Sequence, residues 1–191
     1  MKKLAVLVLA FILAIPVASF ASTLDHEDIV TSKSLSGYKT IGVKLFSTDD
    51  VQYDNVDKDE MRTMKRDDFL QEVQEKLARA TVAALKDDGF DAFIVKGDNA
   101  GKADMIIEGR ITKINLGSAA VRFWVGFGAG GAGMSVKGDL KDAKTGETLV
   151  KFEHENSSGL RDTNDKWEMV EHEAKDLGDK LGEFVQKITR K

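Results

Sequence analysis

The residue types that could do acid–base or metal chemistry are few and scattered. The chain has three histidines, each among acidic neighbours: His26, His154 and His172. A metal site needs two or three such ligands to converge, whereas we expect these three in a polar N-terminal stretch, near a strand end and on a helix. The sequence also lacks the motifs of serine nucleophiles, zinc proteases and P-loops. We therefore predict no metal, no cofactor and no enzymatic activity.

Two other stretches suggest chemistry by their spacing. Residues 47–65 are rich in acids but lack the pattern and central glycine of an EF-hand, so we expect a solvated loop there. Residues 128–133 read Gly-Ala-Gly-Gly-Ala-Gly, the spacing of a dinucleotide-binding loop. Such a loop opens a helix whose N-terminus holds the pyrophosphate, and here an alternating strand pattern follows instead. We therefore predict that the chain binds no nucleotide.

The least ordinary stretch surrounds this glycine motif and runs from Gly117 to Gly133. Large apolar side chains come first, close glycines follow, and the candidate contact residues are Arg122, Phe123, Trp124, Gly126, Phe127, Gly128 and Gly130. If the stretch projects from the sheet, it forms an exposed apolar patch typical of an interface or a membrane contact. If it folds back, the aromatic rings enlarge the core and the glycines let backbones pack closely. The sequence leaves both arrangements open.

Composition limits the class of protein. A length of 191 residues suits one domain, and 42% hydrophobic with 31% charged residues is ordinary for a folded soluble protein. A net charge of −4 without a basic cluster argues against nucleic acid, because phosphate binding needs clustered Lys and Arg. The absence of cysteine excludes disulfides, thiolate metal sites and a lipid-modified N-terminal cysteine.

The N-terminus has the pattern of an export signal. Lys2 and Lys3 precede an apolar run over 4–17, and the small residues Ser19 and Ala21 stand where signal peptidase reads the chain. We predict cleavage after Ala21, a periplasmic location and no lipid anchor. A retained membrane anchor is the alternative, although the apolar run is short for a span.

Apolar periodicity predicts a strand and a helix ahead of the glycine stretch. Residues 38–46 alternate as a strand, and residues 66–88 carry an apolar stripe at helical spacing. Asp67 and Asp68 are expected in the first turn, where the helix dipole favours acids. Gly89 is expected to end the helix as the left-handed residue of a Schellman cap.

Four further strands and a second long helix complete the predicted elements. The strands are expected over 90–95, 104–116, 134–140 and 148–155, with a bulge near Thr112 and a tight turn over 142–147. Asp165 is expected to cap the last helix, whose apolar stripe runs from Trp167 to Ile188. Gly178 and Gly182 lie beside that stripe and predict close approach to the sheet or to another helix.

Together these elements predict an α/β (α+β) fold. We expect a two-layer sandwich with two helices on one face of a mixed five-stranded sheet, in the order β-α-β-β-β-β-α. The strand–helix–strand unit should place its strands parallel, and the last three strands should form an antiparallel meander. The expected organisation is a signal peptide over 1–21, a flexible lead-in over 22–37 and a single domain over 38–191.

The glycine stretch and its surroundings resemble a known family. The likeness is carried by Gly117-Ser118, by Arg122-Phe123-Trp124-Val125-Gly126-Phe127-Gly128-Ala129-Gly130, and by the turn Asp142-Ala143-Lys144-Thr145-Gly146-Glu147. These residues are similar to the core of a bacterial envelope family, domain of unknown function 4410, over most of the chain from about Tyr38. The resemblance implies an exported, non-enzymatic α/β domain without catalytic residues or cofactor. Many members resemble lipoproteins, and this chain departs from them because it has no cysteine.

Two functions fit these observations. The first is an envelope interaction or assembly domain that contacts an unknown envelope protein or a second copy through residues 117–133, with peripheral membrane contact as a further option. The second is a carrier for an apolar ligand or lipid, held between sheet and helices near Trp124 and Trp167. Whether the stretch from Phe123 to Phe127 is exposed would separate them.

Overall fold

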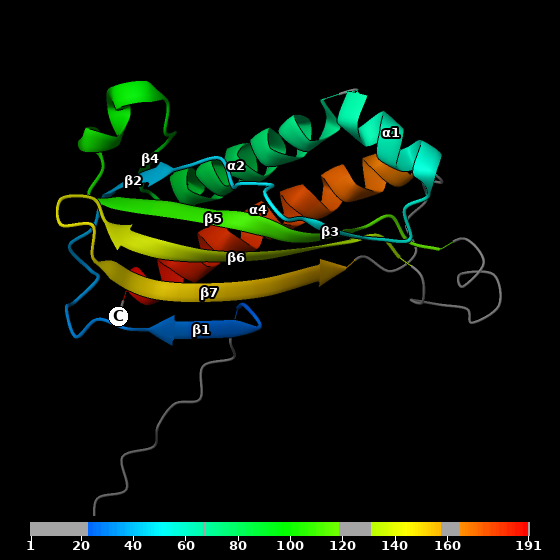
Figure 1. Cartoon of the computed structure of the whole chain (residues 1–191). Coiled ribbons are helices and arrows are strands. Elements are labelled where there is room, and N and C mark those ends of the chain that lie inside the picture. Colours follow the sequence, from blue (N-terminus) through cyan, green and yellow to red (C-terminus); the bar gives the residue numbers. More distant parts are fainter. Residues whose placement is uncertain (1–22, 67, 119–130, 158–164, 191) are drawn as a thin grey trace, which may run out of the picture.

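A computed structural model of the chain describes residues 23–66, 68–118, 131–157 and 165–190. It contains a seven-stranded mixed sheet with the long helices α2 and α4 across one face (Figure 1). The strands are β1 His26–Ile29, β2 Thr40–Val43, β3 Gln52–Asp54, β4 Asp91–Ile94, β5 Met105–Asn115, β6 Gly133–Asp142 and β7 Thr148–Ser157. The helices are α1 Lys58–Arg66, α2 Phe69–Asp87, α4 Lys166–Thr189 and the short 3-10 helix η1 Gly97–Lys102. The mixed α+β class is confirmed, whereas the five-stranded sheet is wrong.

The sheet follows the order β1-β7-β6-β5-β2-β4, with β3 also paired to β5. Strands β2 and β4 are parallel neighbours joined through α2, and β5, β6 and β7 form an antiparallel meander, both as predicted. β2 runs parallel to β5 at 105–107, and β3 runs parallel to it at 113–115. The polar chain between them stays near β5 through a bridge from Ser47 to Arg110.

Several local predictions are confirmed by backbone geometry. Gly89 has φ of 86°, and the N–H of Phe90 donates to the carbonyl of Leu85 at 3.0 Å, which completes the Schellman cap. The register of β5 against β6 shifts at the expected bulge, between Ile111 and Lys113. The turn after β6 has Gly146 at φ of 73°. These signals are local, so the sequence alone carries them.

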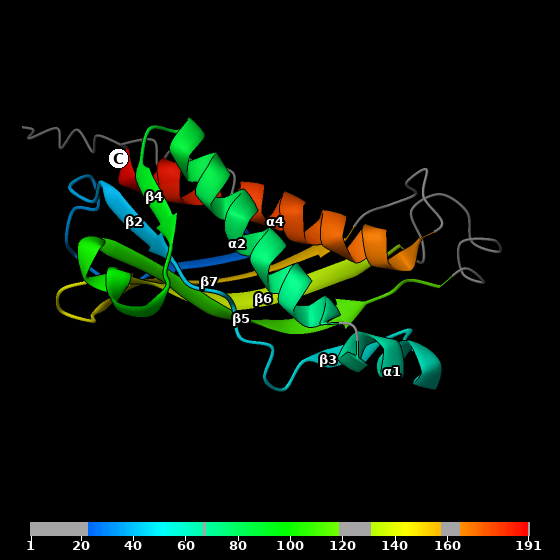
Figure 2. The same cartoon turned by 90° about the horizontal axis from the view of Figure 1, so that it is seen from above.

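Helices α2 and α4 lie side by side, and small residues set their spacing (Figure 2). A Cβ atom at Gly178 would lie 2.5 Å from the Cβ of Ala80, and one at Gly182 would lie 2.4 Å from the Cβ of Ala84. Both distances are shorter than a real Cβ contact, so the glycines allow α4 to approach α2. Of the two partners expected for these glycines, the sheet or another helix, the structure has the helix, α2.

A row of aromatic rings fills the centre of the core. Phe46, Phe152 and Phe184 are each at most 1% exposed, and Phe152 lies 6.3 Å by ring centroid from each of the other two. A Cβ at Gly138 would lie 2.4 Å from the ring of Phe152. Gly138 pairs across the sheet with Gly109, where a Cβ would lie 2.8 Å from the ring of Phe46. The glycine pair makes room for these two rings.

Three predictions made on polar stretches are wrong in part. The flexible lead-in contains β1, which pairs with β7 along its length and is preceded by buried Leu24. The solvated loop over 47–65 contains β3 and most of α1, which buries Met64. Asp68 precedes the first turn of α2, with φ of 51° and no side-chain cap bond. Contacts distant in sequence order these polar residues, and periodicity does not report such contacts.

The sheet face away from α2 and α4 is charged. Glu108 on β5 lies between Lys44 and Lys141, with nitrogen–oxygen distances of 2.6 and 2.5 Å. Lys137 on β6 pairs with Glu153 on β7 at 2.7 Å. Opposite charges facing each other across strands suit a solvated face, although exposed pairs contribute little to stability.

Candidate functional site

The seven predicted contact residues, from Arg122 to Gly130, lie outside the described residues. The residues that flank the stretch are described, and they lie at the ends of neighbouring antiparallel strands. Asn115 ends β5 and pairs with Gly133, the first residue of β6. A strand therefore follows the glycine motif, as predicted. This arrangement contradicts the strand–loop–helix order of a dinucleotide site.

Hydrogen bonds around Asn115 hold the end of β5 in place. The side-chain oxygen of Asn115 accepts a hydrogen bond from the side-chain amide of Asn55 and another from the N–H of Gly117, both at 2.8 Å. The N–H of Leu116 donates to the carbonyl of Asp54 at 3.2 Å, and the Leu116 side chain is fully buried. Gly117 then has φ of 74°, which lets the chain turn at the strand end.

The start of β6 is held as firmly. Ala132 is fully buried, and Gly133 pairs with Asn115 on one side and with Ser157 on the other. A Cβ at Gly133 would lie 3.1 Å from the carbonyl oxygen of Asn156, so the backbone there is closely packed. Both ends of the glycine stretch are thus fixed to the sheet.

Helical residues surround the same end of the sheet. Lys166 at the start of α4 pairs with Glu60 of α1 at 2.6 Å. Trp167 meets Phe69, at the start of α2, edge to face at 4.9 Å. Asn55, Gly117 and Ser118 line a hollow of about 380 Å³ with Glu60, Lys166 and two further α1-side residues, Val56 and Asp57. The end that presents the glycine stretch is therefore built from β3, α1, α4 and the meander.

A row of polar groups links this end to β1 across β7 and α4. The Asn156 amide donates to Glu173, which is fully buried, at 2.7 Å. Lys180 donates to the Asn156 side-chain oxygen at 2.8 Å and to Nε2 of His154 at 3.1 Å. On its other side, Nδ1 of His154 lies 3.0 Å from the Asp25 carboxylate and 3.3 Å from the backbone nitrogen of Asp25.

The row favours a neutral histidine. Burial and the neighbouring Lys180 ammonium lower the pKa of His154, and the Asp25 carboxylate opposes this shift. The two polar side chains that contact His154 each connect elements of the fold. Lys180 connects α4 to β7, and Asp25 connects the start of β1 to β7. The row therefore holds elements of the fold together.

The histidines do not gather into a site. His26 on β1 pairs with Glu153, which lies on the charged face, whereas His154 is buried on the helix side. His172 is exposed on α4. The described residues include no group of three or more His, Cys, Asp or Glu side chains arranged to hold a metal ion.

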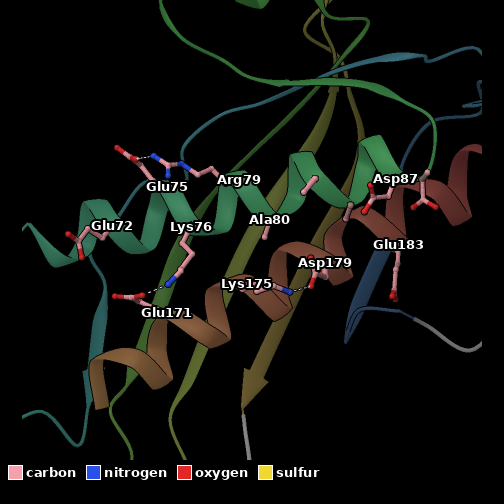
Figure 3. Close-up of a pocket in the computed structure, with 13 residues that line it drawn as sticks. Glu72, Glu75, Lys76, Arg79, Ala80, Asp87, Glu171, Lys175, Asp179 and Glu183 are labelled. Atoms are coloured by element: carbon pink, nitrogen blue, oxygen red, sulfur yellow. Dashed lines mark hydrogen bonds and ion pairs between the residues drawn. The ribbon is translucent and has the colours of Figure 1, made fainter. Parts of the chain in front are cut away.

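A hollow of about 1110 Å³ runs along the outer surface between α2 and α4 (Figure 3). Its floor includes Ala80 and its walls carry ion pairs between Lys76 and Glu171 and, at 2.7 Å, between Lys175 and Asp179. The cations of this groove pair with its own carboxylates. It is a charged surface groove that follows from the close helix packing.

The space between sheet and helices gives the carrier hypothesis no support. Side chains at that interface are fully buried, including Ile107 on β5, Leu77 on α2 and Leu181 on α4. Four hollows lined by described residues lie at the surface. Trp167 packs edge to face on Phe69. In the described ranges, no helix has the length and apolarity needed to cross a membrane.

A family model for "Domain of unknown function (DUF4410)" matches residues 41–161. The chain belongs to this family. The matched range includes residues 41–43 of β2, the whole stretch from Gly117 to Gly133 and the meander, so the resemblance noted from the sequence is confirmed. No curated protein sequence matches the chain.

Solved structures share the fold of this DUF4410 member at low sequence identity. A variant of the PelC dodecamer from Paraburkholderia phytofirmans matches with a TM-score of 0.52 and 12% identity, over 84% of this chain and 97% of that one. Protein XCC0632 from Xanthomonas campestris, of family-model DUF330, matches with a TM-score of 0.50 and 10% identity, over 80% and 86% of the two chains. A putative lipoprotein from Caulobacter crescentus is more distant, with a TM-score of 0.38, 13% identity and coverage of 72% and 87%. The first two show a common fold and nothing further.

Sequence reasoning missed the residues that hold the DUF4410 glycine stretch from the α1 side. One sequence signal was present, the capping box formed by Asp57 and Glu60. The Asp57 side chain accepts a hydrogen bond from the N–H of Glu60, and the Glu60 side chain accepts one from the N–H of Asp57, both at 2.8 Å. That signal predicts a helix beginning at Lys58. The hydrogen bond between Asn55 and Asn115 joins residues 60 positions apart, and no sequence pattern predicts it.

Proposed function

We propose that this chain is an exported domain of the bacterial envelope that works by contacting another protein, and that the contact is made by the stretch between β5 and β6. The observation that supports this most is the support given to both ends of the stretch. Leu116 and Ala132 are fully buried, and Asn115 fastens the turn at Gly117. A stretch held at both ends loses less freedom on binding than a free loop, so more of its contact energy appears as affinity.

The chemistry of the stretch fits a protein contact. Phe123, Trp124 and Phe127 supply large apolar area, and Arg122 adds a charged anchor. Aromatic residues and arginine are enriched in the cores of protein interfaces and among the residues that dominate binding energy. The close glycines beside them let a partner backbone approach.

The partner class follows from compartment and fold. The N-terminal pattern supports export with cleavage after Ala21, and the absence of cysteine supports a domain without a lipid anchor. PelC, whose fold this chain shares, is a dodecamer. We therefore include a second copy of this chain, beside another envelope protein, among the partners of the stretch.

The test replaces the two largest of these side chains. The chain carrying Trp124→Ser and Phe127→Ser should keep its circular dichroism and melting temperature, while its affinity for the wild-type partner falls at least about tenfold, since anchor residues each contribute about 2 kcal/mol or more. The measurements are copurification from envelope extracts and light scattering of the purified chain. Leu45→Ser is the matched control, because Leu45 is an exposed apolar residue elsewhere.

Two results would reject the proposal. One is a wild-type chain that stays monomeric and copurifies with no envelope protein. The other is a double variant that captures partners as well as the wild type does.

A further inference from the structure

The outer edge of the sheet at β1 has an unusual exposed apolar pair. Ile29 and Val30 are 48% and 46% exposed, and with Leu45 they are the large hydrophobic side chains exposed in the described part of the chain. β1 is the outermost strand on its side of the sheet, beyond β7 (Figure 1). Edge strands are normally protected by charge, proline or cover, because an open edge can pair with another strand. The start of this edge carries His26, Glu27 and Asp28, whereas its end has two adjacent apolar residues, Ile29 and Val30.

The edge is held in shape for such pairing. Glu27 of β1 accepts the N–H of Thr23 at 2.9 Å, and its carboxylate lies 3.7 Å from Lys187 of α4. The N–H of Val30 donates to the carbonyl of Leu149 at 3.0 Å. Along a strand, the backbone N–H and C=O groups of successive residues point alternately to one side and to the other. Those of Asp28 and Val30 point toward β7, so those of Ile29 point away from the sheet. No described residue pairs with Ile29 on that outer side.

We infer that β1 pairs with β1 of a second copy of this chain, antiparallel and about a two-fold axis at Ile29. In this register the two Ile29 residues form a hydrogen-bonded pair, and each Val30 lies opposite Asp28 of the other copy. A two-fold contact makes one residue face itself, so the residue at the axis decides the register.

Charge and chain direction exclude the neighbouring registers. An axis at Asp28 would bring two carboxylates face to face, which destabilises a strand pair. An axis at Val30 would need an extended chain beyond Thr31, but the N–H of Lys33 donates to the Thr31 hydroxyl at 3.2 Å and turns the chain there. The axis at Ile29 joins apolar residues, keeps the carboxylates apart and needs no extended chain beyond Thr31. The contact is short, well below a standard interface of about 800 Å² per partner, so we expect weak, concentration-dependent dimers.

This contact uses β1 and not the stretch between β5 and β6. It therefore goes beyond the proposed function, and each can fail without the other. The Trp124→Ser and Phe127→Ser variant should retain the β1 contact.

The test uses the absence of cysteine from the chain. Ile29→Cys, in the full chain purified and oxidised with oxidised glutathione, should form a disulfide dimer, because hydrogen-bonded antiparallel pairs place their Cα atoms about 5.5 Å apart, within disulfide range. Val30→Cys is the matched control, since it is equally exposed and one residue away but lies opposite Asp28. We expect about ten times more dimer from Ile29→Cys on nonreducing gels, because only that pair has disulfide geometry.

A second variant guards against effects of the cysteine itself. Ile29→Lys should remove concentration-dependent dimers in sedimentation equilibrium, whereas Leu45→Lys should keep them. Equal cross-linking at 29 and 30, preferential cross-linking at 30, or an absence of dimers in the wild-type chain would overturn the inference.

Discussion

Replacing Gly178 with valine is expected to lower the melting temperature by about 5–10 °C, from an overpacking cost of about 2–3 kcal/mol. A side chain at Gly178 meets backbone as well as Ala80: its Cβ would lie 2.8 Å from the carbonyl oxygen of Leu77 and 2.8 Å from the nitrogen of Thr81. Backbone cannot rotate away as a flexible side chain can, so α4 must move off α2. The measurement is thermal unfolding followed by circular dichroism.

The sign of the Gly178 effect separates packing from helix propensity. Alanine is better than glycine inside a helix by about 1 kcal/mol, so propensity alone predicts that Gly178→Ala stabilises the protein. The short distances to α2 predict destabilisation instead. Gly101→Val is the matched control, because no atom lies within 4 Å of a Cβ there. A Gly178 variant as stable as the wild type would show that the helices are not in contact at this point.

Replacing Phe152 with alanine is expected to cost about 3–5 kcal/mol, a large share of the 5–15 kcal/mol that stabilises most domains. Its ring is 1% exposed, lies between Phe46 and Phe184, and covers Gly138. Removing it leaves a cavity over a glycine, which has no side chain to refill the space.

Chemical denaturation measures the Phe152 effect as a lower midpoint with little change in slope. Leu45→Ala serves as the control, because surface substitutions usually change stability by less than about 0.5 kcal/mol. A loss below about 1 kcal/mol at Phe152 would mean that the aromatic row is not the centre of the core.

Local signals explain which parts of the fold were predictable. Gly89 needs a left-handed conformation, and Asp165 caps α4 by accepting the N–H of Trp167 at 2.9 Å, so both helix boundaries could be read from neighbouring residues. The bulge near Thr112 could be found because the apolar parity of β5 changes there. In each case the determining residues lie within one or two turns of each other.

Distant contacts explain what was missed. β1 is a strand of four residues whose partners lie on β7, more than 120 residues later, as in the bond from the N–H of Glu155 to Asp25 at 2.7 Å. Among the α1 side chains whose burial the structure describes, residues 58–64, only Met64 is buried, so the apolar stripe of this helix is too weak to detect. The seven contact residues from Arg122 to Gly130 lie outside the described residues, and their role remains a proposal.

The central claim is that the stretch between β5 and β6 contacts another protein in the envelope. Its most direct test is a photo-crosslinking amino acid at position 127 of the full chain, irradiated in intact cells. We predict a discrete adduct of higher mass when the amino acid is at position 127. We predict none when the same amino acid replaces Gly101, where an added Cβ would meet no atom within 4 Å. If position 127 gives no adduct, or only the background seen at position 101, the claim is contradicted.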